Sequence, residues 1–394
     1  MLRQQVPEKM FVLVITLLSV LLYFIPTGFP VQEEGYVRSK ARVVAVDNQQ
    51  VYQRGVVKTG SQGVSIEILD GVYQGAKIET TNTLLGKLEM DKLFEEGDVA
   101  LVVLQGDTRK VYAANVIDYY RLDVEGALFF LFALALFWYA RWTGIKALLS
   151  FIFTTLVLWK ILWPLFLKGW DPIMVSQMTV CLITACITFL IAGWNRVGAA
   201  AFLGTMCGTI AACILGIIFG KLFKVHGAVV PFAETLLHVG FSYLDLTKIF
   251  LAGIVLASSG AMMDVAMDIA VAMAELVEQK PGMTRSEVVA SGMKVGRAVV
   301  GTMTTTLLLA YSGAFTALMM VFMAQGTAIV NILNLTYIAA EILHTLVGSF
   351  GVVLVAPFTA VLAGWLFVPQ SDGIRDFQVK ASHKRISEKP EPLR

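Results

Sequence analysis

Three carboxylates recur at helical spacing within one apolar stretch of the chain. At about 100° per residue on a helix, Asp264, Asp268 and Glu275 fall within about 40° of one another. Ala257 and Gly260 complete this stripe. An ionised aspartate at the centre of a membrane span costs about 2.5–3.5 kcal/mol. The stripe therefore needs a proton, a cation or a basic partner. Carboxylate oxygens suit a proton or a hard monovalent cation better than a soft metal.

The next apolar run supplies candidate partners for these acids. It opens with Arg297, and Thr304 and Thr305 follow within about two helical turns. A short connection makes the two helices expected neighbours. One interpretation is structural, with Arg297 and Lys294 forming interfacial ion pairs with Asp268 and Glu275. We favour it for those two acids, because counting along the helix places them at or beyond the end of the span.

Asp264 lies one turn deeper in the same helix, so the structural interpretation is weaker there. The alternative is an ion or proton path in which Asp264 binds the ion and the hydroxyls of Thr304 and Thr305 face it. Burial would raise the pKa of Asp264 and a nearby Arg297 would lower it. Function is therefore expected to concentrate at Asp264.

Two Glu–His pairs form a second group of candidate residues. Glu234 precedes His238 by one helical turn, and Glu341 precedes His344 by slightly less. Such pairs can bind a metal or relay a proton, or they can simply satisfy each other at an interface. Neither pair is an H-E-x-x-H motif, so a zinc protease is not indicated and we predict no metal site.

Motifs of catalysis and of cofactor binding are missing from the sequence. It contains no glycine-rich phosphate loop, no G-x-S-x-G elbow and no arrangement of Ser or Cys with His. An intramembrane aspartyl protease would need two aspartates on different helices, whereas Asp264 and Asp268 share one. We therefore predict that the protein is not an enzyme and holds no cofactor.

The composition identifies the class of protein. Of 394 residues, 57% are hydrophobic and only 15% are charged, compared with about 25% charged in soluble domains. Lys and Arg number 31 and Asp and Glu number 29, which leaves no basic surface for nucleic acid. A polytopic membrane protein is predicted, with the lipid bilayer as its main partner.

Runs of about 20 apolar residues define about eight transmembrane helices. They are Met10–Phe29, Val124–Ala140, Ala147–Leu167, Pro172–Trp194, Val197–Gly220, Ile249–Ala274, the first part of Ala298–Ala340, and Thr345–Pro369. The first run lacks an A-x-A-like cleavage site, so we interpret residues 1–30 as an uncleaved anchor. The short loops richest in Lys and Arg lie on the side of the basic tail, residues 370–394, which predicts that both termini are cytoplasmic.

Residues 31–123 are different in character and should form a separate domain outside the cytoplasm. Short alternating runs separated by Gly-containing turns predict strands, namely Ala41–Val46, Val64–Leu69, Ala76–Thr81, Val99–Gln105 and Lys110–Ile117. We expect a small antiparallel β-domain, more specifically an OB-like barrel. Because it contains no histidine or cysteine, we interpret it as a structural cap or a partner-binding module.

A weak internal similarity links residues 196–275 with 297–369 of the helical part, residues 124–369. Gly-Thr-Met begins a matching stretch at Gly204 and at Gly301, and each stretch is followed by an Ala-Glu and a His. We predict a parallel repeat in which Val229–Leu246 and Val330–Val347 are equivalent interfacial or re-entrant helices. Chance matches in Gly- and Ala-rich helices are the alternative.

Several of these features together resemble the YibE/F family of bacterial multi-pass membrane proteins. The residues that carry the resemblance are the stretch from Ser258 through Asp264 and Asp268 to Glu275, Gly296-Arg297, Gly301 to Gly313, Ala340-Glu341, and Gly71, Gly75 and Gly97-Asp98 of the outer domain. The resemblance implies a location in a bacterial plasma membrane. It implies little about activity.

Polar residues within spans, re-entrant segments and a duplication favour a secondary transporter or permease, coupled to a proton or a monovalent cation. The rival hypothesis is a membrane scaffold or receptor whose outer domain binds a protein partner. A second copy of the chain is a further candidate partner. Flux that depends on Asp264 would distinguish the two hypotheses.

Overall fold

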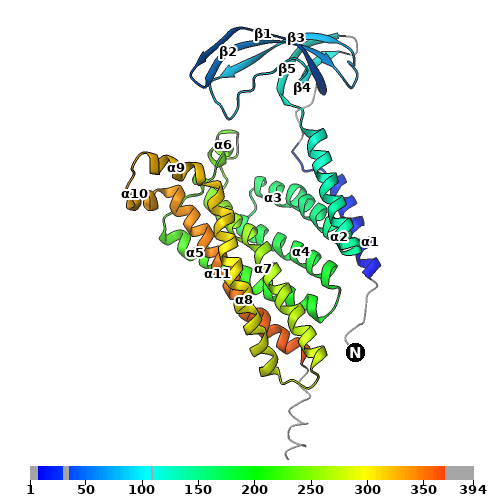
Figure 1. Ribbon diagram of the computed structural model, residues 1–394, viewed down its shortest axis with the longest axis vertical. Helices are drawn as coiled ribbons and strands as arrows, with labels where there is room; N and C mark the ends of the chain where they lie inside the picture. Colours follow the sequence, from blue (N-terminus) through cyan, green and yellow to red (C-terminus); the bar gives the residue numbers. More distant parts are fainter. Residues whose placement is uncertain (1–7, 30–34, 108–109, 369–394) are drawn as a thin grey trace, which may run out of the picture. The chain divides into compact units, whose positions relative to one another are not determined.

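The computed structural model describes residues 8–29, 35–107 and 110–368. The predicted basic tail, residues 370–394, lies outside these ranges. The chain divides into two units, which we describe separately: Phe29–Trp138, which contains the sheet, and Met1–Gly28 together with Tyr139–Arg394, which is helical (Figure 1).

Five antiparallel strands form one sheet in the order β3-β2-β1-β4-β5. They are β1 (Tyr36–Arg54), β2 (Val57–Ile68), β3 (Lys77–Leu85), β4 (Val99–Asp107) and β5 (Lys110–Tyr119). Alternate residues of β4 are buried, because successive side chains of a strand point to opposite faces. The sheet curls until its outer strands meet, and the Thr80 hydroxyl of β3 donates a 2.6 Å hydrogen bond to the carbonyl of Ala114 in β5. The predicted small antiparallel β-domain is confirmed as a near-barrel.

A buried glutamine fastens the loop between β3 and β4 to the sheet. Gln62 of β2 is fully buried, and its side-chain nitrogen donates to the carbonyl of Phe94 at 2.8 Å. Its side-chain oxygen accepts from the Phe94 amide at 3.0 Å and from the Asn82 side chain at 3.1 Å. Satisfied polar groups of this kind hold the buried Phe94 ring against Tyr119, with 5.0 Å between ring centroids.

Long helices form the second unit, and α2 begins in the first. Their bounds are α1 (Glu8–Phe24), α2 (Leu122–Val157), the π-helix η1 (Leu158–Leu162), α3 (Trp163–Leu167), α4 (Pro172–Ala192), α5 (Arg196–Leu222), the 3₁₀-helix η2 (Gly227–Val229), α6 (Ala233–His238), α7 (Leu246–Gln279), α8 (Arg285–Ala314), α9 (Thr316–Ala324), α10 (Ile329–Asn334) and α11 (Thr336–Phe367).

Five helical stretches in the described residues are long and apolar enough to cross a membrane. The longest, Leu122–Leu167, has 46 residues and contains a non-helical backbone conformation at Arg141, with φ 48° and ψ −117°. A sixth candidate is the pair α8 and α9, which are bent by 67° relative to each other. These helices are compatible with a membrane protein, as the composition predicts.

Small residues let α5, α7, α8 and α11 approach closely, and these helices pack side by side (Figure 1). Gly204 of α5 lies against Thr359 of α11, where an added Cβ would overlap the Thr359 hydroxyl and lie 3.1 Å from its Cα. Gly296 of α8 lies against Ala356 of α11, with 3.0 Å between the corresponding Cβ positions. At these two contacts, adding a single methyl group to the glycine would push the helices apart.

The prediction that Val330–Val347 forms a separate short helix is wrong. After the short α10, Leu335 has an extended conformation, and from Thr336 the chain forms one continuous helix of 32 residues. Because this helix is unbroken, Glu341 belongs to the same helix as the predicted final span. Val229–Leu246, in contrast, contains only η2, the six-residue α6 and the start of α7. The two segments are not equivalent, which removes the Glu–His part of the argument for a repeat.

An ion pair at the start of α4 and α7 predicts a pH-dependent stability. Asp171 caps α4 by accepting from the amides of Ile173 and Met174 at 3.1 Å, and it accepts from the Lys248 ammonium at 2.7 Å. The Lys248 ammonium holds the pKa of Asp171 below its usual value.

Because this pKa is lowered by folding, the contribution is complete above about pH 4 and is lost as the pH falls through the lowered value. Since both side chains are partly exposed, we expect a loss of about 0.2–1 kcal/mol. Thermal unfolding between about pH 2 and 5 should show a smaller pH dependence in Asp171→Asn than in the wild type. An unchanged pH dependence in the variant would contradict this.

Candidate functional site

A cluster of polar side chains lies between helices of the bundle. The imidazole of His344 and the carboxylate of Glu341, both on α11, are 3.7 Å apart, and their side chains are 19% and 21% exposed. Tyr311 of α8 covers the imidazole, with 4.3 Å between ring centroids and 31° between ring planes. Gly348 of α11 lies close to α7, because a Cβ placed on it would be 3.1 Å from the Cβ of Ser258 and 4.0 Å from the Tyr311 ring. Three helices therefore meet at this cluster.

Two polar atoms of the cluster are buried and have no hydrogen-bond partner among the described residues. They are the Tyr311 hydroxyl and Nε2 of His344. An unsatisfied buried polar group costs about 1–3 kcal/mol, so such groups call for an explanation, for example a bound water or ion. A histidine also changes its charge near neutral pH, and a carboxylate stabilises its protonated form. The cluster therefore contains the kinds of side chain that proton relays use.

A metal centre is not supported by the described part of the chain. It contains no group of three or more His, Cys, Asp and Glu side chains that could hold a metal ion. The Glu341 cluster supplies one carboxylate and one imidazole, fewer than the three protein ligands typical of a catalytic zinc site.

The acidic stripe of α7 lies on the surface of the helical unit. Asp264, Asp268 and Glu275 are all exposed, and no side chain lies within 4 Å of a Cβ placed on Gly260. Glu275 accepts a hydrogen bond of 3.0 Å from Gln279 in the next turn. Among the described residues, Asp264 and Asp268 have neither a hydrogen bond nor an ion pair.

The expected ion pairs of Arg297 and Lys294 with Asp268 and Glu275 are not formed among the described residues, so this prediction is wrong for a single copy of the chain. The contact between α7 and α8 is made by apolar side chains instead. Gly296 lies beside the Ile269 side chain, at 3.2 Å from a Cβ placed on the glycine. Arg297 is the next residue, and the turn of the helix places it on the exposed side.

The two threonines of α8 differ in their surroundings. The Thr304 hydroxyl donates to the carbonyl of Val300 in its own helix at 3.1 Å, and the side chain is half-buried. Thr305 is exposed. A hydroxyl bonded to its own backbone is already satisfied, so Thr304 is less available to a ligand than the sequence indicated.

The second Glu–His pair forms no comparable cluster. Glu234 and His238 of α6 are 4.0 Å apart, and their side chains are 74% and 76% exposed. An ion pair at such exposure contributes little. The feature missed by the sequence analysis is Tyr311, because its position over His344 depends on how α8 packs on α11. A hydroxyl-bearing aromatic residue in an apolar helix was the available signal.

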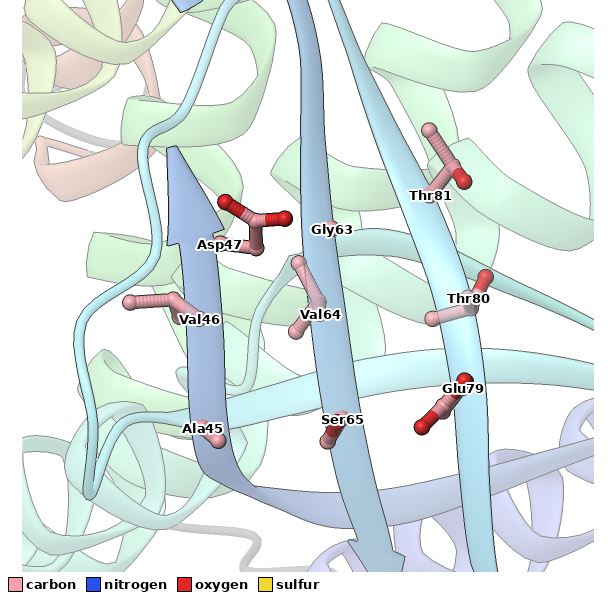
Figure 2. A pocket seen from close by; sticks show the side chains of 9 residues that line it. All are labelled: Ala45, Val46, Asp47, Gly63, Val64, Ser65, Glu79, Thr80 and Thr81. Carbon is pink, nitrogen blue, oxygen red and sulfur yellow. The ribbon is translucent and has the colours of Figure 1, made fainter. Parts of the chain in front are cut away.

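A shallow hollow of about 410 Å³ lies on the sheet of the other unit (Figure 2). Gly63 and Ser65 of β2 form a low floor between Asp47 of β1 and Glu79 of β3, whose carboxylates are drawn in Figure 2. The complete lining is Ala45, Val46, Asp47, Gly63, Val64, Ser65, Glu79, Thr80 and Thr81. No basic side chain lines the hollow, so it offers no partner for a phosphate backbone.

The chain was compared with protein families, curated proteins and solved structures. No curated protein and no solved structure matches the chain. The sequence model of the YibE/F-like protein family matches residues 128–369, a range that contains the acidic stripe of α7 and the Glu341 cluster. Because this range covers more than half of the chain, the protein belongs to the YibE/F-like family.

Proposed function

We propose that the chain is a multi-pass protein of a bacterial plasma membrane with both termini in the cytoplasm. The apolar helices support about eight spans if α1 crosses, Leu122–Leu167 crosses twice and the bent pair α8–α9 crosses once. Lys and Arg in the short loops support the orientation. The sheet unit then lies outside the cytoplasm. Its strand order, with β3 against β5, supports an OB-like barrel.

Within this frame we infer a secondary transporter or permease that couples the movement of its substrate to a proton or a monovalent cation. The observation that carries this proposal is the Glu341–His344–Tyr311 cluster. Ionisable residues within membrane-spanning segments are costly and typically serve ion or proton pathways. Here the orphaned atoms of His344 and Tyr311 provide a donor and an acceptor for a bound proton carrier or ion.

The cluster can couple charge to packing in a simple way. When His344 gains a proton, the imidazolium attracts the Glu341 carboxylate 3.7 Å away, and Tyr311 lies over the charged ring. When the proton leaves, Glu341 loses this partner. The protonated and neutral states of His344 therefore differ in how strongly α8 and α11 attract each other. A conformational change can be coupled to a proton only through such a difference. Asp264 is a second point on the proposed path.

A scaffold or receptor is the second candidate function, and the hollow between Asp47 and Glu79 favours it. An acidic surface hollow fits a positively charged ligand or protein segment. This hypothesis needs no flux across the membrane, so reconstitution separates it from transport.

The test uses the purified full chain in liposomes, with a pH-sensitive dye for protons and radioactive Na⁺ for cations, both driven by a potassium diffusion potential. Wild-type protein should carry one of the two ions. His344→Gln and Glu341→Gln should each slow this flux at least about tenfold, equivalent to about 1.4 kcal/mol of barrier. His226→Gln is the matched control, because His226 is exposed and lies outside the cluster.

Each outcome decides something. No flux above empty liposomes from well-folded wild-type protein would favour the scaffold hypothesis. Wild-type rates in both His344→Gln and Glu341→Gln would remove the cluster from the transport path.

A further inference from the structure

Two exposed helix faces of the bundle carry complementary residues. On α7 the face consists of small and acidic side chains, Ala257, Gly260, Asp264 and Asp268; we call it the acidic face. On α8 the face consists of Arg297, Gly301, Thr305 and Leu308; we call it the basic face. All eight residues are exposed. Nothing lies within 4 Å of a Cβ placed on Gly260 or Gly301, so both backbones are open to close approach.

The two faces match in register when the helices run antiparallel. With a rise of about 1.5 Å per residue, Asp268 lies about 17 Å from the Gln279 end of α7, and Arg297 lies about 18 Å from the start of α8 at Arg285. The same count places Asp264 level with Gly301. Asp268 of one helix is then opposite Arg297 of the other. The glycines of the same two faces, Gly260 and Gly301, are small enough for tight packing.

Within one copy these charges remain apart. Among the described residues neither Asp268 nor Arg297 has an ion pair, because the internal α7–α8 contact uses Ile269 beside Gly296. An unpaired charge beside lipid is costly even near the end of a span, so an opposite charge from outside its own copy would stabilise both Asp268 and Arg297.

We propose that a second copy of this chain supplies that charge. The acidic face of one copy packs antiparallel on the basic face of the next, with Asp268 paired to Arg297. One chain carries both faces, so the surface is complementary to another copy of itself. A twofold arrangement makes the pairing twice, and a rotational arrangement makes it once per subunit in a ring. This inference does not require transport activity, and its test uses Asp268 and Arg297 rather than Asp264, which also lies on the proposed path.

The test is charge reversal with two differently tagged full-length copies in mild detergent. Wild-type copies should co-purify. Asp268→Arg expressed alone, or Arg297→Asp expressed alone, should reduce co-purification at least about tenfold, about 1.4 kcal/mol. Co-expression of the two single variants should restore it, because each interface can then pair opposite charges between copies.

Two controls keep the result interpretable. Lys221→Glu reverses an exposed charge on α5, a helix that contributes to neither face, and should leave association unchanged. Gly301→Leu adds bulk where a Cβ meets nothing within its own copy, so it should fold normally and still reduce association.

Three results would overturn the proposal. One is wild-type association in both single variants. Another is restoration only when both reversals are in the same chain, which would indicate a pair within one copy. The third is a monomeric wild-type protein both in detergent and after cross-linking in native membranes, which would leave lipid or another protein against these faces.

Discussion

Asp264→Asn is expected to abolish the coupled flux of the proposed transporter while leaving its unfolding temperature unchanged or slightly higher. The amide keeps the volume of the side chain but can neither exchange a proton nor offer a charge to a cation. Asp264 is exposed and has no hydrogen bond or ion pair among the described residues, so its replacement breaks no internal contact. Removing a carboxylate that lies only about one helical turn from the end of a span relieves a smaller cost than at the span centre, where it reaches about 2.5–3.5 kcal/mol.

The measurement is ion uptake into liposomes together with thermal unfolding of the same preparation. Glu278→Gln is the control, because it neutralises another exposed acid of α7 near the end of the helix and should retain flux. If Asp264→Asn and Arg297→Gln both lower the unfolding temperature, the two residues are a structural pair and the functional assignment of Asp264 fails.

Gly204→Ala should destabilise the helical unit by about 1–3 kcal/mol. The added methyl group would overlap the Thr359 hydroxyl and lie 3.1 Å from the Thr359 Cα, so relief requires α5 and α11 to move apart. A rotamer change of Thr359 relieves only the hydroxyl, because the Cα belongs to the backbone. The loss should appear as a lower unfolding temperature in detergent.

Gly253→Ala provides the matched control for this prediction. Gly253 is also within a long helix, but a Cβ placed on it meets nothing within 4 Å. Alanine favours helix over glycine by about 0.5–1 kcal/mol, so this variant should be as stable as the wild type or more stable. Equal unfolding temperatures for wild type and Gly204→Ala would show that the two helices do not pack as closely as described.

The strands were predictable because their alternation and their glycine turns are local signals. Their lengths were not. The predicted strand Ala41–Val46 is the central part of β1, which continues to Arg54 through polar residues. There the backbone pairing of β1 with β2, for example Tyr52 opposite Thr59, maintains the strand without a buried side chain on every second residue. The alternation of apolar and polar residues reports which side chains are buried, so it cannot reveal backbone pairing with a neighbouring strand.

The helical candidate site was only partly predictable for a related reason. Glu341 and His344 are neighbours on one helix, so their pairing could be inferred from spacing alone. The position of Tyr311 over His344 and the separation of Arg297 from Asp268 depend on which faces of α7, α8 and α11 pack together. In helices that are apolar on all sides, the sequence pattern does not single out the packed face.

The contact between β3 and β5 has a consequence for how the sheet unit can recruit another protein. An open sheet presents two edge strands to which a foreign strand can add through backbone hydrogen bonds, a route to both recognition and aggregation. Here the two edge strands meet each other, and the Thr80–Ala114 hydrogen bond joins them. A foreign strand that adds to β3 at Thr80 or to β5 at Ala114 would therefore have to displace this hydrogen bond, which disfavours strand addition at that place.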